Sequence, residues 1–244
     1  MASLIQRIVR QAATTFPNSL TVSSNLENLI ALVEGLTATD LGLKADAKDA
    51  LAIYPQAPVT HVSIYEGKNF TMGVFILHPG MAIPLHDHPG MNGICKVLYG
   101  SIKLTSFEGL QSRNFMKGGA SKYVQVKRIP EKILTADTKS QFFLPIRDIY
   151  HSMKATDGPA AFFDILAPPY RTKDYKTDCH YFRELTVSEH PEIDLEKLKE
   201  YNEILNLEEK LNLDDLTWLT EVPTPLDYYC NTLEYTGPTL SVKS

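Results

Sequence analysis

The most constraining feature of this sequence is a succession of short apolar and aromatic runs that begins near residue 57. The runs read HVSIY, FTMGVFIL, GICKVLYG, SIKLTSF, KYVQV, QFFLPI, AAFFDIL and HYFREL, and glycine, proline, asparagine or aspartate separates most of them. Runs of this length and composition are typical of β-strands, and no helical pattern alternates with them. The sequence therefore predicts a mainly β protein built as an antiparallel sandwich or barrel.

Helical patterns are confined to two stretches. Residues 1–50 carry apolar residues at three- and four-residue steps, and residues 188–215 combine such spacing with ten acidic residues and three lysines. The spaced residues are Leu26, Leu29, Ile30, Val33 and Leu36 in the first stretch, and Leu195, Leu198, Tyr201, Ile204 and Leu205 in the second. We predict a helical segment over 1–50 docked on a barrel domain over 51–244. Residues 188–215 are an acidic helical appendage of that domain and a candidate partner surface.

The first residues, MASLIQRIVRQAATTF, allow two interpretations. The stretch lacks acidic residues and is rich in serine and threonine, as in a mitochondrial transit peptide. Its apolar residues also fit an amphipathic helix that docks on the domain. These residues are Leu4, Ile5, Ile8, Val9 and Ala12. The docked helix is the preferred interpretation, and secretion is not expected because Arg7 and Arg10 interrupt the apolar run.

Composition excludes several functional classes. A net charge of −5 disfavours nucleic-acid binding through bulk charge. No apolar run approaches the ~18 residues of a membrane span. The three cysteines, Cys95, Cys179 and Cys230, are too few and too scattered for a disulfide framework and fit a reducing compartment. We therefore expect a cytoplasmic protein, with the nucleus as an additional location and mitochondria less favoured, and we expect it to be a monomer. The basic stretch 109–141, with seven lysines or arginines and two acids, is interpreted as a solvated face.

The segment IPLHDHPGMNG, residues 83–93, places His86 and His88 one residue apart. On an extended strand residues i and i+2 point to the same face, so the two imidazoles converge while Asp87 points away. Two neutral imidazoles form part of a site for Fe, Zn, Cu or Ni. A pair of surface histidines is the alternative.

Glycine spacing around this pair resembles the first cupin motif. Gly80 precedes His86 by five intervening residues, and Gly93 and Gly100 follow at the matching intervals. In the motif a glutamate ligand stands where this chain has Gly93, so the site must be completed by histidine. The candidates are His61, His78, His151, His180 and His190.

Among these candidates His151 follows a proline and a polar turn, roughly where the second cupin motif has its histidine. The match is imperfect, since Pro145 is one residue too far upstream, Asp148 replaces a glycine and Ala155 replaces an asparagine. A surface histidine at a strand end is the alternative for His151. His61 and His78 are interpreted as ordinary strand residues, and His190 as a solvated one.

Longer strings resemble the cysteamine (2-aminoethanethiol) dioxygenase family, which includes the plant cysteine oxidases. They are PLHDHPGMNGICKVLYGSIKL, DGPAAFFDILAPPY and DCHYFREL, with MASLIQRIVRQA and TWLTEVPTP similar to the animal branch. Residues 188–215 have no counterpart that we recognise in the family. The resemblance implies a cupin double-stranded β-helix, Fe(II) held by His86, His88 and His151, and oxidation of a thiol to a sulfinic acid with O₂. It implies cysteamine or an N-terminal cysteine as substrate, the latter linked to oxygen sensing through the N-degron pathway.

Physical chemistry supports this implication independently. Three neutral imidazoles leave a divalent metal with a charge of +2, whereas a carboxylate ligand would reduce it to +1. The higher charge favours an anionic ligand such as a thiolate, because a coordinated thiol loses its proton. Oxidation to a sulfinate supplies all four electrons that O₂ requires, so no cosubstrate is needed. The absence of a Rossmann-type glycine motif or a P-loop is consistent with this.

Four further residues are candidates for the site. Asp164 lies in the apolar run AAFFDILAPP, where an unpaired carboxylate is costly, so we expect it to orient a ligand histidine or receive the substrate's amine. A hydrogen bond to a turn is the alternative for Asp164.

Tyr170 either points its hydroxyl at the pocket or packs as a partly exposed side chain. Cys179 and Tyr181 share one strand face. In the resembled family this pair can form a thioether crosslink, and the alternative is simple packing. Cys95 is expected to pack, because no base is evident beside it.

Two rival functions remain. One is a non-catalytic cupin that binds a metal or a small ligand, and the other is a zinc or manganese isomerase. The preferred thiol substrate is left open by the sequence.

Overall fold

The computed structural model describes residues 2–17, 25–43, 57–110, 123–144, 149–171, 178–204 and 210–241. Strands dominate these ranges, which confirms the mainly β prediction. They are β1 (Val59–Glu66), β2 (Thr71–Leu77), β3 (Ala82–Asp87), β4 (Asn92–Tyr99), β5 (Ile102–Gly109), β6 (Tyr123–Leu134), β7 (Gln141–Phe143), β8 (Ile149–Ala155), β9 (Ala160–Ala167), β10 (Tyr181–Glu184), β11 (Leu216–Val222) and β12 (Cys230–Leu233). The helices are α1 (Leu4–Thr15), α2 (Leu26–Glu34) and α4 (Leu195–Ile204), with short 3-10 turns at Thr39–Leu41, Val187–Glu189 and Leu213–Asp215.

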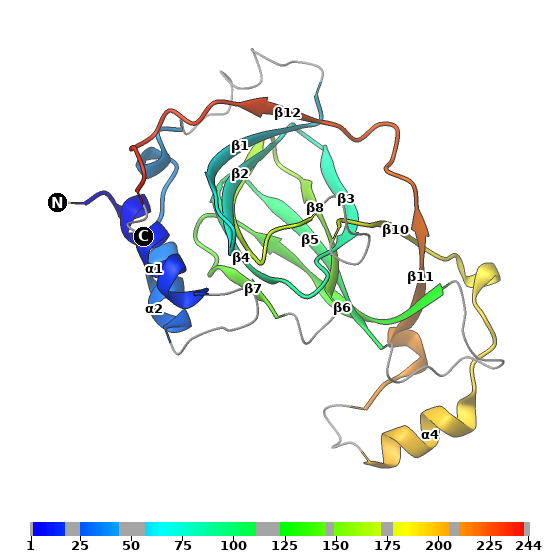
Figure 1. Cartoon of the computed structure of the whole chain (residues 1–244). Helices are drawn as coiled ribbons and strands as arrows, with labels where there is room; N and C mark the ends of the chain where they lie inside the picture. The colour runs from blue at the N-terminus through cyan, green and yellow to red at the C-terminus, as the bar shows by residue number, and fades with distance from the viewer. Residues whose placement is uncertain are drawn as a thin grey trace.

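The strands form two sheets (Figure 1). The first has the order β12-β1-β2-β9-β4-β7, and the second, β10-β11-β6-β5-β8-β3, closes on itself through the pairing of β10 with β3. All pairings are antiparallel except that of β12 with β1. Because consecutive strands such as β3, β4 and β5 alternate between the sheets, the chain winds as a double-stranded β-helix. The predicted cupin fold is confirmed.

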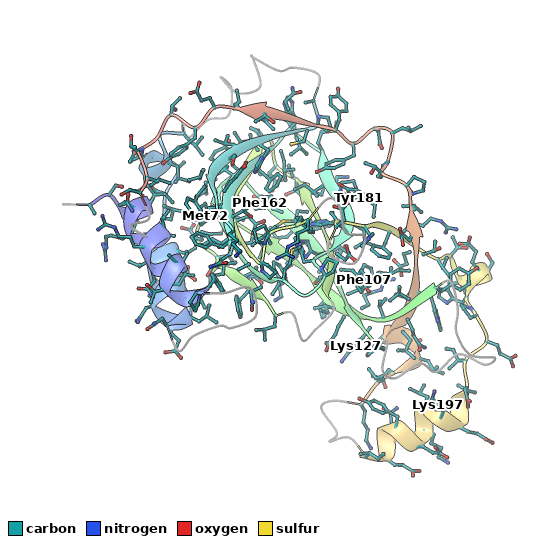
Figure 2. All side chains as sticks on the ribbon, viewed as in Figure 1. Met72, Phe107, Lys127, Phe162, Tyr181 and Lys197 are labelled. Atoms are coloured by element: carbon teal, nitrogen blue, oxygen red, sulfur yellow. The ribbon has the colours of Figure 1, made fainter. Side chains whose placement is uncertain are left out.

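Side chains that alternate along each strand give the first sheet two apolar faces. Its outer face packs against α1 and α2 (Figure 1), where Ile5, Ile8 and Val9 are fully buried. Met72 belongs to this outer core, whereas Phe162 lies in a second core between the two sheets (Figure 2). The N-terminal residues thus form a docked amphipathic helix in the structure. The predicted domain boundary at residues 50 and 51 lies outside the described residues and stays a prediction.

The second sheet curls around a small core of its own, which contains Phe107, Val126 and Leu219. Its strand β6 is longer than the predicted run KYVQV, because it continues to Leu134 through charged residues and Pro130. A register shift between β5 and β6 accommodates this proline near Ile129, consistent with the tendency of proline to occur at bulges. Part of the expected basic stretch, residues 111–122, lies outside the described residues.

Of the described residues of the acidic segment, only those of α4 form an α-helix, and there Leu198 is buried against Leu110, Leu211 and Leu216. The amphipathic pattern is less well buried than predicted, since Leu195 is 57% and Ile204 83% exposed. Leu205 lies outside the described residues. His190 was expected to be solvated, and this is wrong, because its ring packs on Trp218 with centroids 4.7 Å apart and it is half-buried. None of the described helices has the length and apolar character that crossing a membrane requires.

Candidate metal centre and substrate pocket

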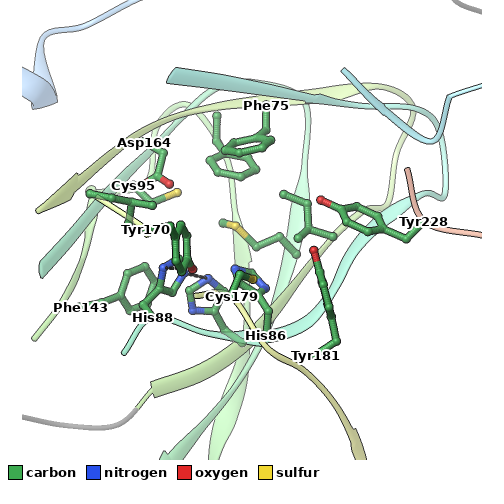
Figure 3. Close-up of a pocket in the computed structure, with 15 residues that line it drawn as sticks. Phe75, His86, His88, Cys95, Phe143, Asp164, Tyr170, Cys179, Tyr181 and Tyr228 are labelled. Atoms are coloured by element: carbon green, nitrogen blue, oxygen red, sulfur yellow. Dashed lines mark hydrogen bonds between the residues drawn. The ribbon is translucent and has the colours of Figure 1, made fainter. Parts of the chain in front are cut away.

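A cavity of about 200 Å³ lies between the two sheets (Figure 3). Strands of both sheets and the segments around residues 170, 179 and 228 supply its walls. The lining residues are Phe75, Ile83, His86, His88, Cys95, Phe143, His151, Met153, Phe162, Asp164, Leu166, Tyr170, Cys179, Tyr181 and Tyr228. All seven residues that the sequence analysis proposed for the site therefore line one cavity.

Three histidines converge on one side of this cavity (Figure 3). His86 lies near the end of β3 and is paired in register with His151 on β8, while His88 follows β3 directly. Their ring centroids are 4.7 to 4.8 Å apart in every pair, and one ligand atom from each lies within 4.8 Å of the others. The other candidate third ligands, His61, His78, His180 and His190, are not part of this group.

Hydrogen bonds orient two of the three rings. His86 Nδ1 lies 2.9 Å from the carbonyl oxygen of Pro84 and donates its proton to it. His88 Nδ1 lies 2.6 Å from the hydroxyl of Tyr170, which in turn donates to the carbonyl oxygen of Asp87 at 2.6 Å. Tyr170 therefore accepts the proton of His88 Nδ1. In both histidines this leaves Nε2 without a proton, and the Nε2 of His88 lies 3.3 Å from that of His151. Metal-binding histidines are commonly oriented in this way, by a hydrogen bond at the other ring nitrogen.

Burial lowers the pKa of all three histidines, and it lowers that of His88 and His151 well below the usual value. Neutral imidazole is the form that binds a metal ion. The Nδ1 atom of His151 is buried without a hydrogen-bond partner among the described residues. A group of three neutral nitrogen donors with no carboxylate in it fits a transition metal better than magnesium or calcium.

The position of the missing carboxylate ligand is occupied by an aromatic ring. Gly93 on β4 pairs with Phe143 on β7, and a Cβ atom at residue 93 would lie 3.1 Å from the Phe143 ring. That ring stacks on His151 with centroids 4.6 Å apart. Phe143 therefore packs where a longer side chain from position 93 would have to pass. The packing of Phe143 thus leaves no room for a glutamate side chain at position 93.

Asp164 lies on β9 with Cys95 and Gly73 as its cross-strand neighbours. Burial raises the pKa of its carboxyl to about 7, although the backbone N–H of Ile165 partly opposes this. Among the described residues no hydrogen bond joins Asp164 to His86, His88 or His151. No contact supports the expectation that Asp164 orients a ligand histidine. Binding of the substrate's amine stays its predicted role.

Cys179 and Tyr181 both line the cavity, as expected of residues two positions apart. The thiol of Cys179 shares hydrogen bonds with the hydroxyls of Tyr170 and Tyr181, and burial raises its pKa to about 11. Tyr181 begins β10 and is the register partner of His86. Its ring lies beside that of Tyr228 (Figure 3), with centroids 5.7 Å apart. The crosslink between Cys179 and Tyr181 stays a prediction.

Several pocket features were not anticipated from the sequence. Asp87 accepts hydrogen bonds from the backbone N–H of His180 at 2.8 Å and from its Nδ1 at 3.0 Å, which joins β3 to the segment that carries Cys179. Tyr228 reaches the cavity from the chain's last segment, where the tyrosine-rich string LDYYC was its only signal. Cys95 is buried in the cavity wall, and burial raises its thiol pKa well above the usual value, which is consistent with the expected packing role.

Comparison with known proteins adds a family match. The model of the PCO_ADO family matches residues 32–240. The chain is 36% identical to a 2-aminoethanethiol dioxygenase of Mus musculus, over 98% of this chain and 96% of that protein. It is 34% identical to one of Homo sapiens, over 98% and 97%. It is also 24% identical to plant cysteine oxidase 1 of Arabidopsis thaliana, over 84% and 67%.

Proposed function

The chain belongs to the PCO_ADO family, and we propose that it is an Fe(II)-dependent dioxygenase that converts the thiol of a small aminothiol or of an N-terminal cysteine to a sulfinic acid. The reaction is R–SH + O₂ → R–SO₂H, in which both oxygen atoms enter the product and the sulfur supplies all four electrons. The observation that carries the proposal is the group of three neutral imidazoles, without a carboxylate, at the wall of a buried cavity of about 200 Å³.

His86, His88 and His151 would hold the iron through their Nε2 atoms. Bound there, Fe(II) would supply the centre at which the thiolate sulfur and O₂ react. Since no ligand from the protein is anionic, the site keeps its full divalent charge and favours an anionic sulfur ligand. Phe143 supports this choice, because its ring occupies the path by which a carboxylate from position 93 would reach the metal.

Substrate recognition would depend on Asp164. Cysteamine and an N-terminal cysteine share an aminoethanethiol head, whose ammonium group lies two carbons from the sulfur. A buried carboxylate in the same small cavity as the histidines would pair with that ammonium group. The apolar residues Phe75, Met153 and Phe162 would exclude water from the remaining volume and so strengthen this pair.

A test begins with metal content. Protein purified and reloaded under anaerobic conditions should bind about one equivalent of Fe(II), and it should consume O₂ only when cysteamine or an N-terminal-cysteine peptide is present. His86→Ala should lose iron and O₂ uptake together. His78→Ala is the matched control, because His78 lies outside the group of three.

Other outcomes would favour the rival functions. Tight zinc or manganese binding with no thiol-dependent O₂ uptake would indicate a metal isomerase, and metal binding without any turnover would indicate a non-catalytic cupin. Oxygen sensing requires that an N-terminal-cysteine protein be oxidised at physiological O₂ concentrations. The cytoplasmic location and the monomeric state stay predictions, and size-exclusion chromatography with light scattering tests the second.

A further inference from the structure

A second, larger chamber adjoins the cavity that holds the histidines. Its volume is about 440 Å³, and it shares Phe75, Asp164, Leu166 and Tyr170 with the inner cavity. The remaining walls come from β1 and β2, from the turn between them and from one residue after β9. These residues are His61, Ser63, Glu66, Gly67, Thr71, Met72, Gly73 and Pro169. The two spaces are therefore neighbouring compartments of one groove, with Asp164 at their boundary.

The size of the outer chamber exceeds the needs of the smallest substrate. Cysteamine has four non-hydrogen atoms, and with its sulfur at the histidines and its amine at Asp164 it would end inside the inner cavity. The outer chamber would then hold only water. An N-terminal-cysteine peptide has the same head but continues from its first carbonyl group, so its next residues need a space of this kind beyond Asp164.

Strand register gives the direction and reach of this space. Asp164 on β9, Gly73 on β2 and Ser63 on β1 are successive cross-strand partners. Two strand spacings separate Asp164 from Ser63, which is roughly 10 Å. The hydroxyl of Ser63 donates a 2.7 Å hydrogen bond to Glu66 Oε1 and so holds this carboxylate at the chamber wall. An extended peptide advances about 3.3 Å per residue, so a long side chain at the second or third position reaches Glu66.

The charges of the groove favour a cation. Of the described residues that line the two compartments, the acids are Asp164 and Glu66, and none is lysine or arginine. His61 stacks on Phe75 with ring centroids 4.7 Å apart, and burial, opposed by Glu66, lowers its pKa, which keeps it neutral. Gly73 leaves room for the His61 ring, because a Cβ atom there would collide with Nε2. The wall shared by the two compartments therefore carries no positive charge of its own.

We propose that the outer chamber binds the residues that follow the N-terminal cysteine of a peptide substrate, and that Glu66 selects a lysine or arginine side chain at the second or third position. This inference rests on the proposed function. It adds a specificity-determining residue that has no part in the reaction itself, since Glu66 touches neither the histidines nor Asp164 in the structure. An exposed ion pair of this kind predicts a preference of about two- to fivefold at low salt.

The test compares three Fe(II)-loaded proteins: the wild type, Glu66→Gln and Glu203→Gln. Glu203→Gln is the control, because it removes the same charge from an exposed residue on α4 that is far from the groove. The peptides are Cys-Lys-Gly, Cys-Gly-Lys and Cys-Gln-Gly with extended neutral tails. We expect a two- to fivefold higher kcat/KM for at least one lysine peptide over the glutamine peptide. Glu66→Gln should reduce this ratio to about one, whereas Glu203→Gln should leave it unchanged.

A preference that persists in Glu66→Gln, or equal rates for all peptides in the wild type, would overturn the inference while leaving thiol oxidation intact. Failure of the proposed function looks different, because neither cysteamine nor any peptide would then be oxidised. Binding of fluorescently labelled Ser-Lys-Gly and Ser-Gln-Gly peptides, which cannot turn over, gives a readout independent of oxidation. Their affinity ratio should shrink in Glu66→Gln and in 0.5 M NaCl, where exposed charges are screened.

Discussion

At the scale of single residues, the contact between Gly93 and Phe143 decides what kind of metal site the cavity can hold. A Cβ atom at residue 93 would lie 3.1 Å from a ring that itself stacks on His151. Gly93→Glu should therefore lower the free energy of unfolding by about 1–3 kcal/mol, the usual cost of overpacking. Chemical denaturation of the metal-free protein measures this.

The double variant Gly93→Glu/Phe143→Ala completes this test. Removing the ring should relieve the added strain, so the two substitutions together should cost less than the sum of their separate effects. Additive costs would show that the residue at position 93 and the ring at position 143 do not compete for space.

Tyr170 is a positioning residue, because it acts on the metal through His88. Tyr170→Phe removes the acceptor of the His88 Nδ1 proton and frees the ring to rotate. Loss of such an outer contact typically weakens metal binding 10- to 100-fold. Competition with a chelator should show this loss for Tyr170→Phe but not for Tyr65→Phe, whose ring stacks on Phe70 outside the cavity. Unchanged affinity would mean that His88 is held by packing alone.

Asp164 makes the stability of the metal-free protein depend on pH. Its carboxyl has a pKa of about 7 in the folded protein, against 3.8 for an exposed aspartate, because burial disfavours the charge. Between these values the folded state keeps a proton that the unfolded chain has lost, so this group's contribution to the free energy of unfolding falls as the pH rises. As the pH rises from 4 to 7, the free energy of unfolding of Asp164→Asn should therefore increase relative to that of the wild type by on the order of 1–4 kcal/mol.

Thermal unfolding of both proteins in the presence of a chelator measures this difference. The comparison cancels the contributions of the buried histidines, whose pKa values shift in the opposite direction. A difference in stability that stays constant over the range would show that the folded protein carries an ionised Asp164 already at low pH.

At the scale of elements, a buried lysine joins three parts of the chain. Lys96 on β4 is 5% exposed, and its Nζ donates hydrogen bonds to the carbonyl oxygens of Ala136 and Thr138. It also lies 3.7 Å from Glu34 at the end of α2, which accepts hydrogen bonds from the backbone and side chain of Ser140. Helix α2, strand β4 and the turn before β7 are therefore held together beside the strand that carries Phe143.

Lys96→Met would leave two carbonyl oxygens and a partly buried carboxylate without their cation. We expect it to lower the free energy of unfolding by about 3–5 kcal/mol, the usual cost of breaking a buried ion pair from one side. Lys103→Met is the control, because the pair of Lys103 with Glu131 is exposed and worth at most about 1 kcal/mol. Similar losses in the two variants would contradict the structural role of Lys96.

At the scale of the whole molecule, the strands and the pair of His86 and His88 were predictable because their signals are local, whereas His151 was assigned through its resemblance to a known motif. Alternation of apolar residues marks most strands. Residues two apart on a strand share a face, and this predicts that His86 and His88 converge. Phe143, Tyr228 and the contact of Asp87 with His180 were not predictable. Each arises from pairing between segments that are distant in sequence. The full length of β6 was missed because charged residues and Pro130 mask a strand whose partners compensate for them.

The late position of Tyr228 in the chain has a consequence for biosynthesis. The third histidine, His151, leaves the ribosome 77 residues before this tyrosine. At typical translation rates of about 5–20 residues per second, that interval lasts roughly 4–15 s. A nascent chain can thus present all three histidines before the tyrosine that lines their cavity has been made.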